Sequence, residues 1–154
     1  PFIVELNDLA QRRMLPKPGP AISYPRWDPQ GEYVTVIGNE TGSFLGYRIA
    51  ATGARAPERF TDEPSSIPTS FFPDGNTMMG YVVTNDMGRD LWVFRIDGED
   101  EVLLRTAANE RAPVVAPDGG AFAYVPDESG EDRVYIRLYP ANGGSGHEQD
   151  GECN

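Results

Sequence analysis

The chain has 154 residues, of which 13 are basic and 24 acidic, so its formal net charge is −11. A length near 150 residues suits one domain that buries roughly 70% of its unfolded surface. The negative charge argues against binding to nucleic acid, whose phosphates need a basic face, and against an anionic membrane surface.

Glycine and proline punctuate the chain. The 17 glycines and 14 prolines lie between short apolar runs, as in proteins made of many short strands and tight turns. The single cysteine, Cys153, excludes a fold built on internal disulfides. No signal peptide is visible, and no run of about 20 apolar residues would insert into a membrane.

Strand-like segments follow one another from the first residues onward. Residues 2–6 and 13–15 favour short strands, whereas 7–15 is the only weak helix candidate. Eleven further strand-like runs lie at 24–27, 33–37, 44–49, 59–61, 69–72, 78–83, 91–96, 102–106, 112–115, 121–125 and 134–138. Residues 141–154 are rich in glycine, serine and acidic residues, which predicts a flexible tail.

One turn motif recurs at a fixed interval. Its copies are Asp28-Pro29-Gln30-Gly31, Phe72-Pro73-Asp74-Gly75 and Ala116-Pro117-Asp118-Gly119, and their prolines are 44 residues apart. Proline pre-sets φ at the second position of a type I turn, and glycine takes the left-handed conformation that closes a hairpin with a bulge. The motif therefore predicts a hairpin turn in each copy.

The 44-residue interval predicts an all-β fold made of repeated sheets. Each unit offers four short antiparallel strands, here named A to D, and segment 91–96 is apolar on both faces, as in a sheet packed between neighbours. Four-stranded sheets stacked at this interval describe a β-propeller, which typically needs 4–8 blades to close. About three blades are present, which predicts an incomplete or open propeller. The expected units are the end of a preceding blade at 1–20, blades at 21–66 and 67–111, a partial blade at 112–140 and the tail at 141–154.

The repeat resembles a known family. Pro113-Val114-Val115-Ala116-Pro117-Asp118-Gly119 is similar to the Pro-x-x-Ser-Pro-Asp-Gly turn of TolB-like (WD-repeat-like) β-propellers, with Ala116 in place of serine. The resemblance covers about residues 20–140. Segments 109–113, 123–125, 128–130 and 134–137 look most like the C-terminal propeller of bacterial eukaryote-like serine/threonine kinases. That resemblance implies a sensor or interaction module of a larger bacterial protein.

Two other functions remain open at this stage. Prolyl-oligopeptidase-type serine peptidases carry similar repeats in a propeller that gates the active site, and TolB-like proteins are envelope-associated scaffolds. Either the kinase or the peptidase function would place the catalytic domain outside this chain. The compartment, whether cytoplasmic or extracytoplasmic, is not resolved.

No residue pattern predicts catalysis, a metal site or a cofactor. The kinase phosphate loop and catalytic aspartates are missing, and the only histidine, His147, has no nucleophile elbow nearby. The acidic runs 85–90 and 127–132 do not have the spacing of an EF-hand and fit solvated hairpin tips. We therefore expect a non-enzymatic segment.

A partner-binding face is predicted where blade-end loops gather. The D-to-A connections and the B-to-C hairpin tips should lie at one end of the blades. The acidic residues expected there are Asp62, Glu63, Glu110, Asp127 and Glu128. They favour a basic protein or a small ligand and steer its approach. The uncovered faces of the end blades also predict self-association.

Overall fold

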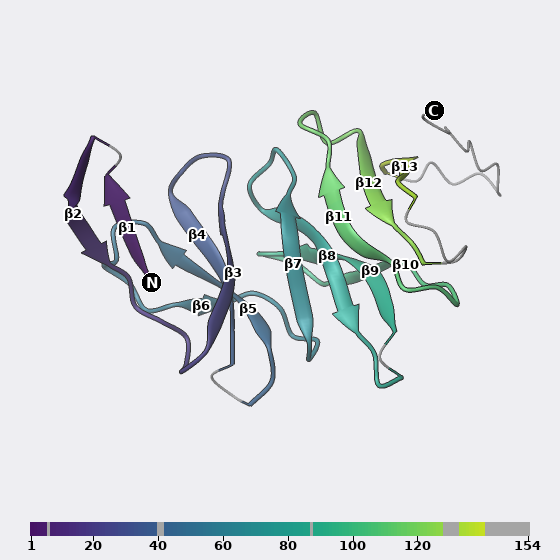
Figure 1. Cartoon of the computed structure of the whole chain (residues 1–154), viewed down its shortest axis with the longest axis horizontal. Helices are drawn as coiled ribbons and strands as arrows, with labels where there is room; N and C mark the ends of the chain where they lie inside the picture. Colours follow the sequence, from purple (N-terminus) through teal and green to yellow (C-terminus); the bar gives the residue numbers. More distant parts are fainter. Residues whose placement is uncertain (6, 40–41, 87, 128–132, 141–154) are drawn as a thin grey trace.

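The computed structural model describes residues 1–5, 7–39, 42–86, 88–127 and 133–140. In these ranges the regular structure is entirely β, with thirteen strands in four antiparallel sheets (Figure 1). None of these residues forms a helix that could cross a membrane. The all-β fold expected from the repeat is confirmed. The predicted tail at 141–154 lies outside the described residues.

The sheets follow the chain order without crossovers. The N-terminal hairpin pairs β1 (Phe2–Glu5) with β2 (Asp8–Met14). Blade 1 contains β3 (Ile22–Trp27), β4 (Tyr33–Gly38), β5 (Leu45–Ala50) and β6 (Glu58–Arg59). Blade 2 contains β7 (Ser66–Phe71), β8 (Thr77–Val83), β9 (Arg89–Arg95) and β10 (Glu101–Leu104). Blade 3 contains β11 (Arg111–Val115), β12 (Ala121–Val125) and β13 (Tyr135–Leu138). The unit boundaries at residues 21, 67 and 112 remain predictions.

The helix candidate at 7–15 is wrong, because these residues mainly form strand β2. Met14 pairs with Phe2 and Arg13 pairs with Ile3 across the hairpin. Leu15 follows as a buried residue, and its N–H donates to Pro1 O at 3.0 Å. A segment without a 3.6-residue apolar period gains more from pairing with β1 than from an isolated helical turn.

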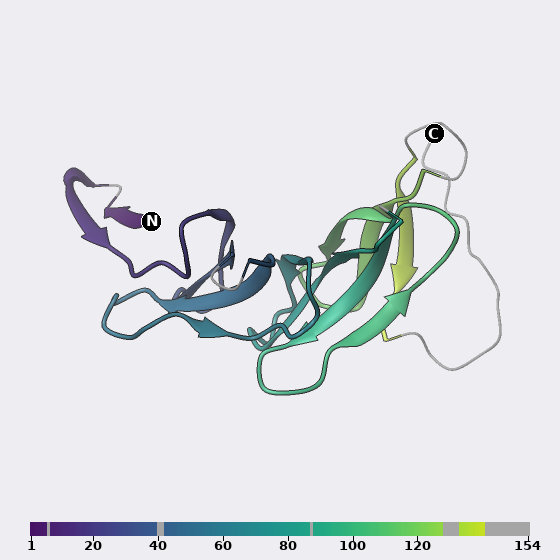
Figure 2. The same ribbon diagram turned by 90° about the horizontal axis from the view of Figure 1, so that it is seen from below.

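The sheets stand side by side in an open arc, with the N-terminal hairpin at one end and blade 3 at the other (Figures 1 and 2). The first strands of the blades lie along the inner side of the arc and contact one another directly. Arg26 Nε donates to Thr69 O at 3.0 Å, and Thr69 Oγ1 donates to Pro113 O at 3.1 Å. The sheets do not close into a ring, so the expected open propeller is confirmed.

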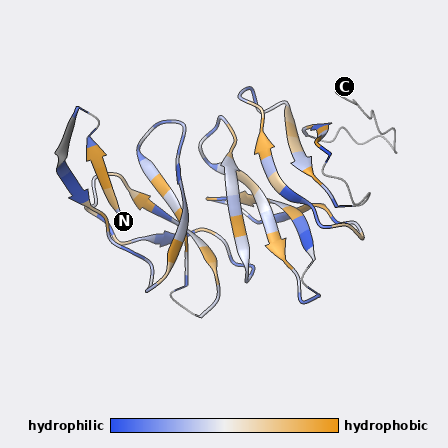
Figure 3. Cartoon of the chain, in the orientation of Figure 1, coloured by the Kyte–Doolittle hydropathy of each residue, from blue (hydrophilic) through white to orange (hydrophobic). Residues whose placement is uncertain are grey.

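Apolar side chains fill the spaces between successive sheets, and Figure 3 shows the apolar residues concentrated on the strands. The core between the N-terminal hairpin and blade 1 contains Leu15, Val34, Val36, Leu45, Tyr47 and Ile49. The core on the blade 1 side of blade 2 contains Met78, Val82 and Phe94. The core between blades 2 and 3 contains Phe72, Met79, Leu91, Val115, Phe122 and Tyr124. Blade 2 is therefore covered on both faces, as segment 91–96 predicted.

The recurring turn has the same backbone geometry in all three blades. Gly31, Gly75 and Gly119 have φ angles of +73°, +72° and +75°. Each glycine N–H donates to the carbonyl of the first turn residue, at 3.1, 3.1 and 2.9 Å. The prediction of a left-handed glycine at this position is confirmed, and the turn joins strands A and B in every blade.

Candidate functional site

The connection between blades 2 and 3, residues 105–110, lies at the B-to-C end of both blades. Glu110 N donates to Arg89 O at 3.1 Å, at the start of β9. Asp90 follows Arg89 in the chain, and its Oδ2 lies 2.6 Å from Arg105 Nε. Asn109 donates from its backbone N–H and from its side-chain amide to the carboxylate of Asp127, at 2.7 Å in both cases. The connection is thus bonded to the start of β9 on one side and to Asp127 of blade 3 on the other.

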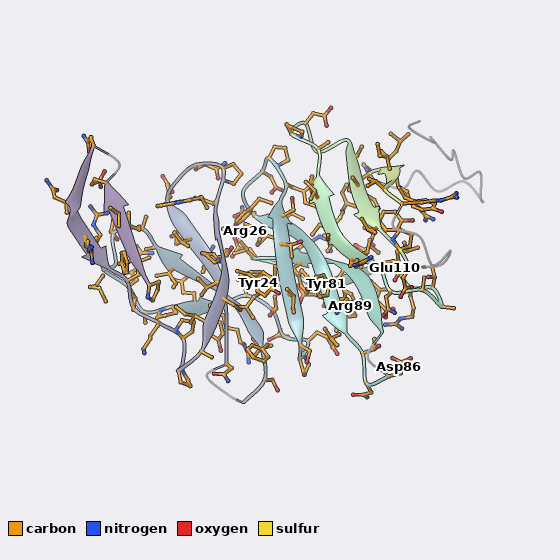
Figure 4. The ribbon with its side chains drawn as sticks, in the orientation of Figure 1. Tyr24, Arg26, Tyr81, Asp86, Arg89 and Glu110 are labelled. Carbon is orange, nitrogen blue, oxygen red and sulfur yellow. The ribbon has the colours of Figure 1, made fainter. Side chains whose placement is uncertain are left out.

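Two fully exposed carboxylates accompany this connection. Hydrogen bonds from the backbone N–H and then the side chain of Asn109 hold the pKa of Asp127 below its usual value. The hydroxyl of Thr84 and then the N–H of Gly88 do the same for the pKa of Asp86 at the tip of the β8–β9 hairpin (Figure 4). Both groups are ionised at neutral pH, so this end of the blades carries negative charge.

Glu110 was predicted to lie on the surface, but its side chain is only 1% exposed. Its Oε1 accepts a hydrogen bond from the hydroxyl of Thr106, and Thr106 Oγ1 accepts one from Ala108 N at 3.0 Å. The connection folds over its own last residue and encloses the carboxylate. A partner approaching from solvent cannot contact Glu110 in this arrangement, so Glu110 is a structural residue of the connection.

The other predicted residues that the structure describes fall at two separate places, the connection between blades 1 and 2 and the segment after β12. Asp62 is exposed, its carboxylate lies 2.8 Å from Arg59, and its N–H donates to Asp100 Oδ2 at 3.5 Å. Glu63 is exposed beside it in the connection from blade 1 to blade 2. Asp127 follows β12 in blade 3 and bonds to Asn109 of the connection between blades 2 and 3, and Glu128 lies outside the described residues. As a binding face, Asp62, Glu63 and Asp127 stay a prediction.

Sequence reasoning missed a contact between strand β3 of blade 1 and strand β8 of blade 2. The phenol groups of Tyr24 and Tyr81 meet there, and the guanidinium of Arg89 lies 5.7 Å from the centre of the Tyr81 ring (Figure 4). Burial, then the neighbouring Tyr24, raise the pKa of Tyr81 above its usual value, while Arg89 opposes the shift. Tyr24 has φ +53°, and Ala112, two repeats later, has φ +50°.

At the opposite end of the blades, a cavity of about 300 Å³ lies between the A-to-B turns of blades 1 and 2. Four of its polar side chains, those of Asp28, Thr35, Arg48 and Asp74, have partners within the protein. Asp28 Oδ1 accepts the N–H of Tyr33 at 2.9 Å, and Arg48 pairs with Glu58 at 2.7 Å. Within the described ranges, no three His, Cys, Asp or Glu side chains converge on a metal-sized space. The cavity is best described as the gap between two packed turns.

No family model matches the chain, and no curated protein matches it in sequence. Solved structures resemble it in fold. A putative TolB from Agrobacterium tumefaciens matches with TM-score 0.75 and 17% identity, over 89% of this chain and 50% of that one. TolB from Acinetobacter baumannii matches with TM-score 0.65 and 21% identity, over 79% of this chain and 30% of that one. An oligogalacturonate lyase from Vibrio parahaemolyticus matches with TM-score 0.62 and 16% identity, over 79% of this chain and 36% of that one.

These similarities establish a TolB-like β-propeller fold, which the sequence had indicated. They do not assign an activity to this chain, since the identities are low and the same fold occurs in both TolB proteins and a lyase. The chain spans half or less of the length of each of these structures.

Proposed function

Because the chain has a TolB-like propeller fold, we propose that it is a non-catalytic binding module of a larger bacterial protein. Its partner is a basic protein or ligand that docks at the B-to-C end of the blades. The observation that carries this proposal is the set of exposed acidic groups on the connection between blades 1 and 2, at the tip of the β8–β9 hairpin and after β12. The proposed face consists of Asp62, Glu63, Asp86 and Asp127.

The rigidity of the second connection supports binding at this end. Asp127 is fixed by two bonds from Asn109, and Asp90 is neutralised by Arg105. A partner that docks beside a loop already held in place loses less conformational entropy than one that must order the loop. Exposed charges of one sign also speed the approach of an oppositely charged partner, in a way that salt weakens.

The absence of catalysis is part of the proposal. Three carboxylates near the connection between blades 2 and 3 are already bonded within the protein: Asp90 to Arg105, Asp127 to Asn109 and Glu110 to Thr106. The only histidine and the only cysteine, His147 and Cys153, lie outside the described residues. We therefore place any reaction of the larger protein in another domain.

The identity of that domain rests on residue resemblance alone. Segments 109–113 and 134–137 resemble the propeller of bacterial serine/threonine kinases, which favours a kinase over a peptidase of the prolyl-oligopeptidase type. The coding sequence that flanks this segment discriminates between them. Kinase motifs upstream support the first, whereas a Gly-x-Ser-x-Gly elbow downstream contradicts it.

Charge reversal tests the binding face. The variant Asp62→Lys with Glu63→Lys should lower the affinity for basic partners captured by the wild-type chain by about tenfold or more, because like charges then face each other. The matched control is Glu5→Lys with Glu32→Lys, which changes net charge equally at exposed positions in the N-terminal hairpin and the blade 1 turn. Affinities are measured by surface plasmon resonance at low and high salt.

The control decides between a face and a general charge effect. Loss of binding in the first variant alone supports the proposed face. Equal loss in both variants contradicts it, because only net charge then matters. Unchanged binding in both variants also contradicts it.

A further inference from the structure

An arginine and two tyrosines form a polar cluster where blades 1 and 2 meet (Figure 4). Tyr24 belongs to β3, Tyr81 belongs to β8, and Arg89 is the first residue of β9. Val83 pairs with Arg89 and Tyr81 pairs with Leu91, so the guanidinium and the Tyr81 ring lie on one face of blade 2. Both blades have a neighbouring sheet on each side, so the exposure of this cluster does not arise from an end of the arc.

The repeat does not require polar groups at this junction. Positions 24, 68 and 112 correspond in the three blades, and so do positions 37, 81 and 125, because each set lies at a fixed distance from the recurring turn. The junction of blades 2 and 3 has Pro68 and Val125 where this one has Tyr24 and Tyr81. The fold therefore builds the same junction without hydroxyl groups, and the two tyrosines need another explanation.

Arg89 is a half-buried cation without a carboxylate partner. Within the described ranges its side chain forms no ion pair and no hydrogen bond, whereas half-buried Arg48 and Arg95 each pair with a glutamate. The chain has 24 acidic residues, so a shortage of carboxylates does not explain the difference. A cation that has lost part of its hydration is stabilised by an anion that reaches it.

The two carboxylates nearest to Arg89 in the sequence are held by other groups. Asp90 lies on the opposite face of β9, where it pairs with Arg105. Asp86 accepts the hydroxyl of Thr84 within its own hairpin turn. The N–H donors of the Arg89 guanidinium are therefore not used within the described part of the chain.

The tyrosine pair supplies one more donor. The hydroxyl groups of Tyr24 and Tyr81 share a hydrogen bond, and each hydroxyl has a single hydrogen. The bond between them uses one of the two hydrogens, so the other remains for a third group. Tyr24 is 45% exposed, so a ligand can reach this pair from solvent. A guanidinium beside a phenol hydroxyl is suited to bind a carboxylate through charge-assisted hydrogen bonds.

An acidic group close by constrains the rest of the ligand. Asp86 lies three residues before Arg89, which places the two within about 10 Å of each other along the chain. Its carboxylate is fully exposed. A ligand with negative charge alone is repelled by Asp86 and by the net charge of −11. A carboxylate that has a cationic group next to it fits both Arg89 and Asp86.

We propose that Arg89 and the Tyr24–Tyr81 pair bind a carboxylate flanked by a cationic group, as in the carboxyl end of a basic peptide or in a free basic amino acid. The inference rests on the proposed function, because it states how the basic partner of the acidic face is held. It adds a specificity that the face alone lacks. The face attracts positive charge, whereas Arg89 selects a carboxylate.

Fluorescence anisotropy of labelled peptides tests the proposal on the full chain. The probes are a short lysine–alanine peptide that ends in a free carboxylate and the same peptide that ends in an amide. The carboxylate form should bind about tenfold more tightly, because it adds charge-assisted hydrogen bonds at Arg89. Non-specific attraction to an acidic chain gives the reverse order, because the amide form carries more positive charge.

Variants locate the bound carboxylate. Arg89→Gln should bind the two peptides equally. Arg137→Gln is the matched control, because it changes the net charge by the same amount and its guanidinium also lies over a tyrosine ring, 5.6 Å from the centre of Tyr124. It should keep the preference for the carboxylate form. Tyr24→Phe removes one hydroxyl and should reduce the preference by about threefold.

Two further measurements complete the test. Far-UV circular dichroism checks that each variant keeps its strands. Should Arg89→Gln fail to fold, Arg89→Lys keeps the charge without the planar fork and should show a reduced preference. Competition with free L-lysine separates the two sources of the carboxylate. Displacement of the peptide identifies a free amino acid as a sufficient ligand, whereas no displacement assigns the site to a peptide end.

Equal affinity of the two peptides for the wild type overturns the inference, as does a preference that survives in Arg89→Gln. A preference that is also lost in Arg137→Gln reduces the effect to net charge. Failure of the inference is distinguishable from failure of the proposed function. If both peptides bind equally and Asp62→Lys with Glu63→Lys weakens both, the acidic face stands without the carboxylate site. If that double variant keeps full affinity and the preference, the carboxylate site stands and the acidic face fails. Binding of neither peptide contradicts both.

Discussion

Aspartate holds the recurring turn in different ways in different blades. In blade 1 it occupies the first turn position, where Asp28 Oδ1 accepts the N–H of Tyr33 at 2.9 Å. In blade 2 it occupies the third position, where Asp74 Oδ1 accepts the N–H groups of Asn76 and Thr77 at 2.9 and 2.8 Å. The backbone of the hairpin is the same in both cases. Both aspartates, Asp28 and Asp74, serve turn geometry.

Asp74→Ala should destabilise the chain by about 1–2 kcal/mol at neutral pH, because three hydrogen bonds are lost from an exposed turn. Burial raises the pKa of Asp74, but the bonds from Thr77 and Asn76 outweigh it and leave the pKa below its ordinary value of 3.8. The contribution is therefore present above pH 3.8 and is lost as the pH falls through the folded-state pKa.

Urea unfolding at pH 7 and near pH 2.5 measures the effect, and the difference from wild type should shrink at the lower pH. Asp118→Ala is the control, because Asp118 accepts a hydrogen bond from Gly120 N but takes part in fewer bonds. It should cost less than Asp74→Ala. An equal, pH-independent loss in both variants would contradict this account.

At the scale of the element, the inner strand of each blade is bulged. The register shifts between Ser23 and Arg26 in β3, between Pro68 and Ser70 in β7 and between Arg111 and Val114 in β11. The bulge frees backbone carbonyls for bonds to a neighbouring blade: Thr69 O accepts from Arg26 Nε at 3.0 Å, and Pro113 O accepts from Thr69 Oγ1 at 3.1 Å. The same irregularity thus ties neighbouring sheets together.

Gly80→Ala should destabilise blade 2 by about 2–3 kcal/mol, because β7 and β8 approach closely at this bulge. A Cβ at residue 80 would lie 2.3 Å from Ile67 O and 2.6 Å from Pro68 Cα, which are backbone atoms. The control is Gly120→Ala, whose Cβ would meet Asp118 at an ordinary 3.5 Å. Thermal unfolding followed by circular dichroism compares the two. Equal melting temperatures of the two variants would show that β7 and β8 accommodate the added methyl group without loss of stability.

Across the whole molecule, burial is greatest in blade 2. Met78 and Phe94 face blade 1, whereas Met79 and Leu91 face blade 3, and all four side chains are fully buried. The N-terminal hairpin and blade 3 each have one covered face. Local stability should therefore fall from the middle of the arc toward its ends.

Amide hydrogen exchange should follow this gradient. Peptides covering 77–95 should exchange more slowly than peptides covering 2–14 and 135–138, because only blade 2 is covered on both faces. Mass spectrometry of the exchanged chain measures the rates. Uniform protection along the chain would contradict the gradient and indicate one cooperative unit.

The sequence by itself determined the repeat, the turns and the alternation of strands. Gly31, Gly75 and Gly119 could be assigned because left-handed turn geometry depends on a few consecutive residues. Strand identity at 78–83 and 91–96 followed from local composition in the same way. The two-sided burial of blade 2 was also predictable, because alternating apolar residues leave neither strand face polar.

Only the tertiary structure decided which groups meet across the sheets. Strand β2 forms because β1 lies beside it, and Glu110 is buried because its connection folds over it. Tyr24 meets Tyr81 although 57 positions separate them in the chain. These contacts depend on how one blade is placed against the next. That placement is set by packing between segments about 44 residues apart in the chain, and no local sequence pattern predicts it.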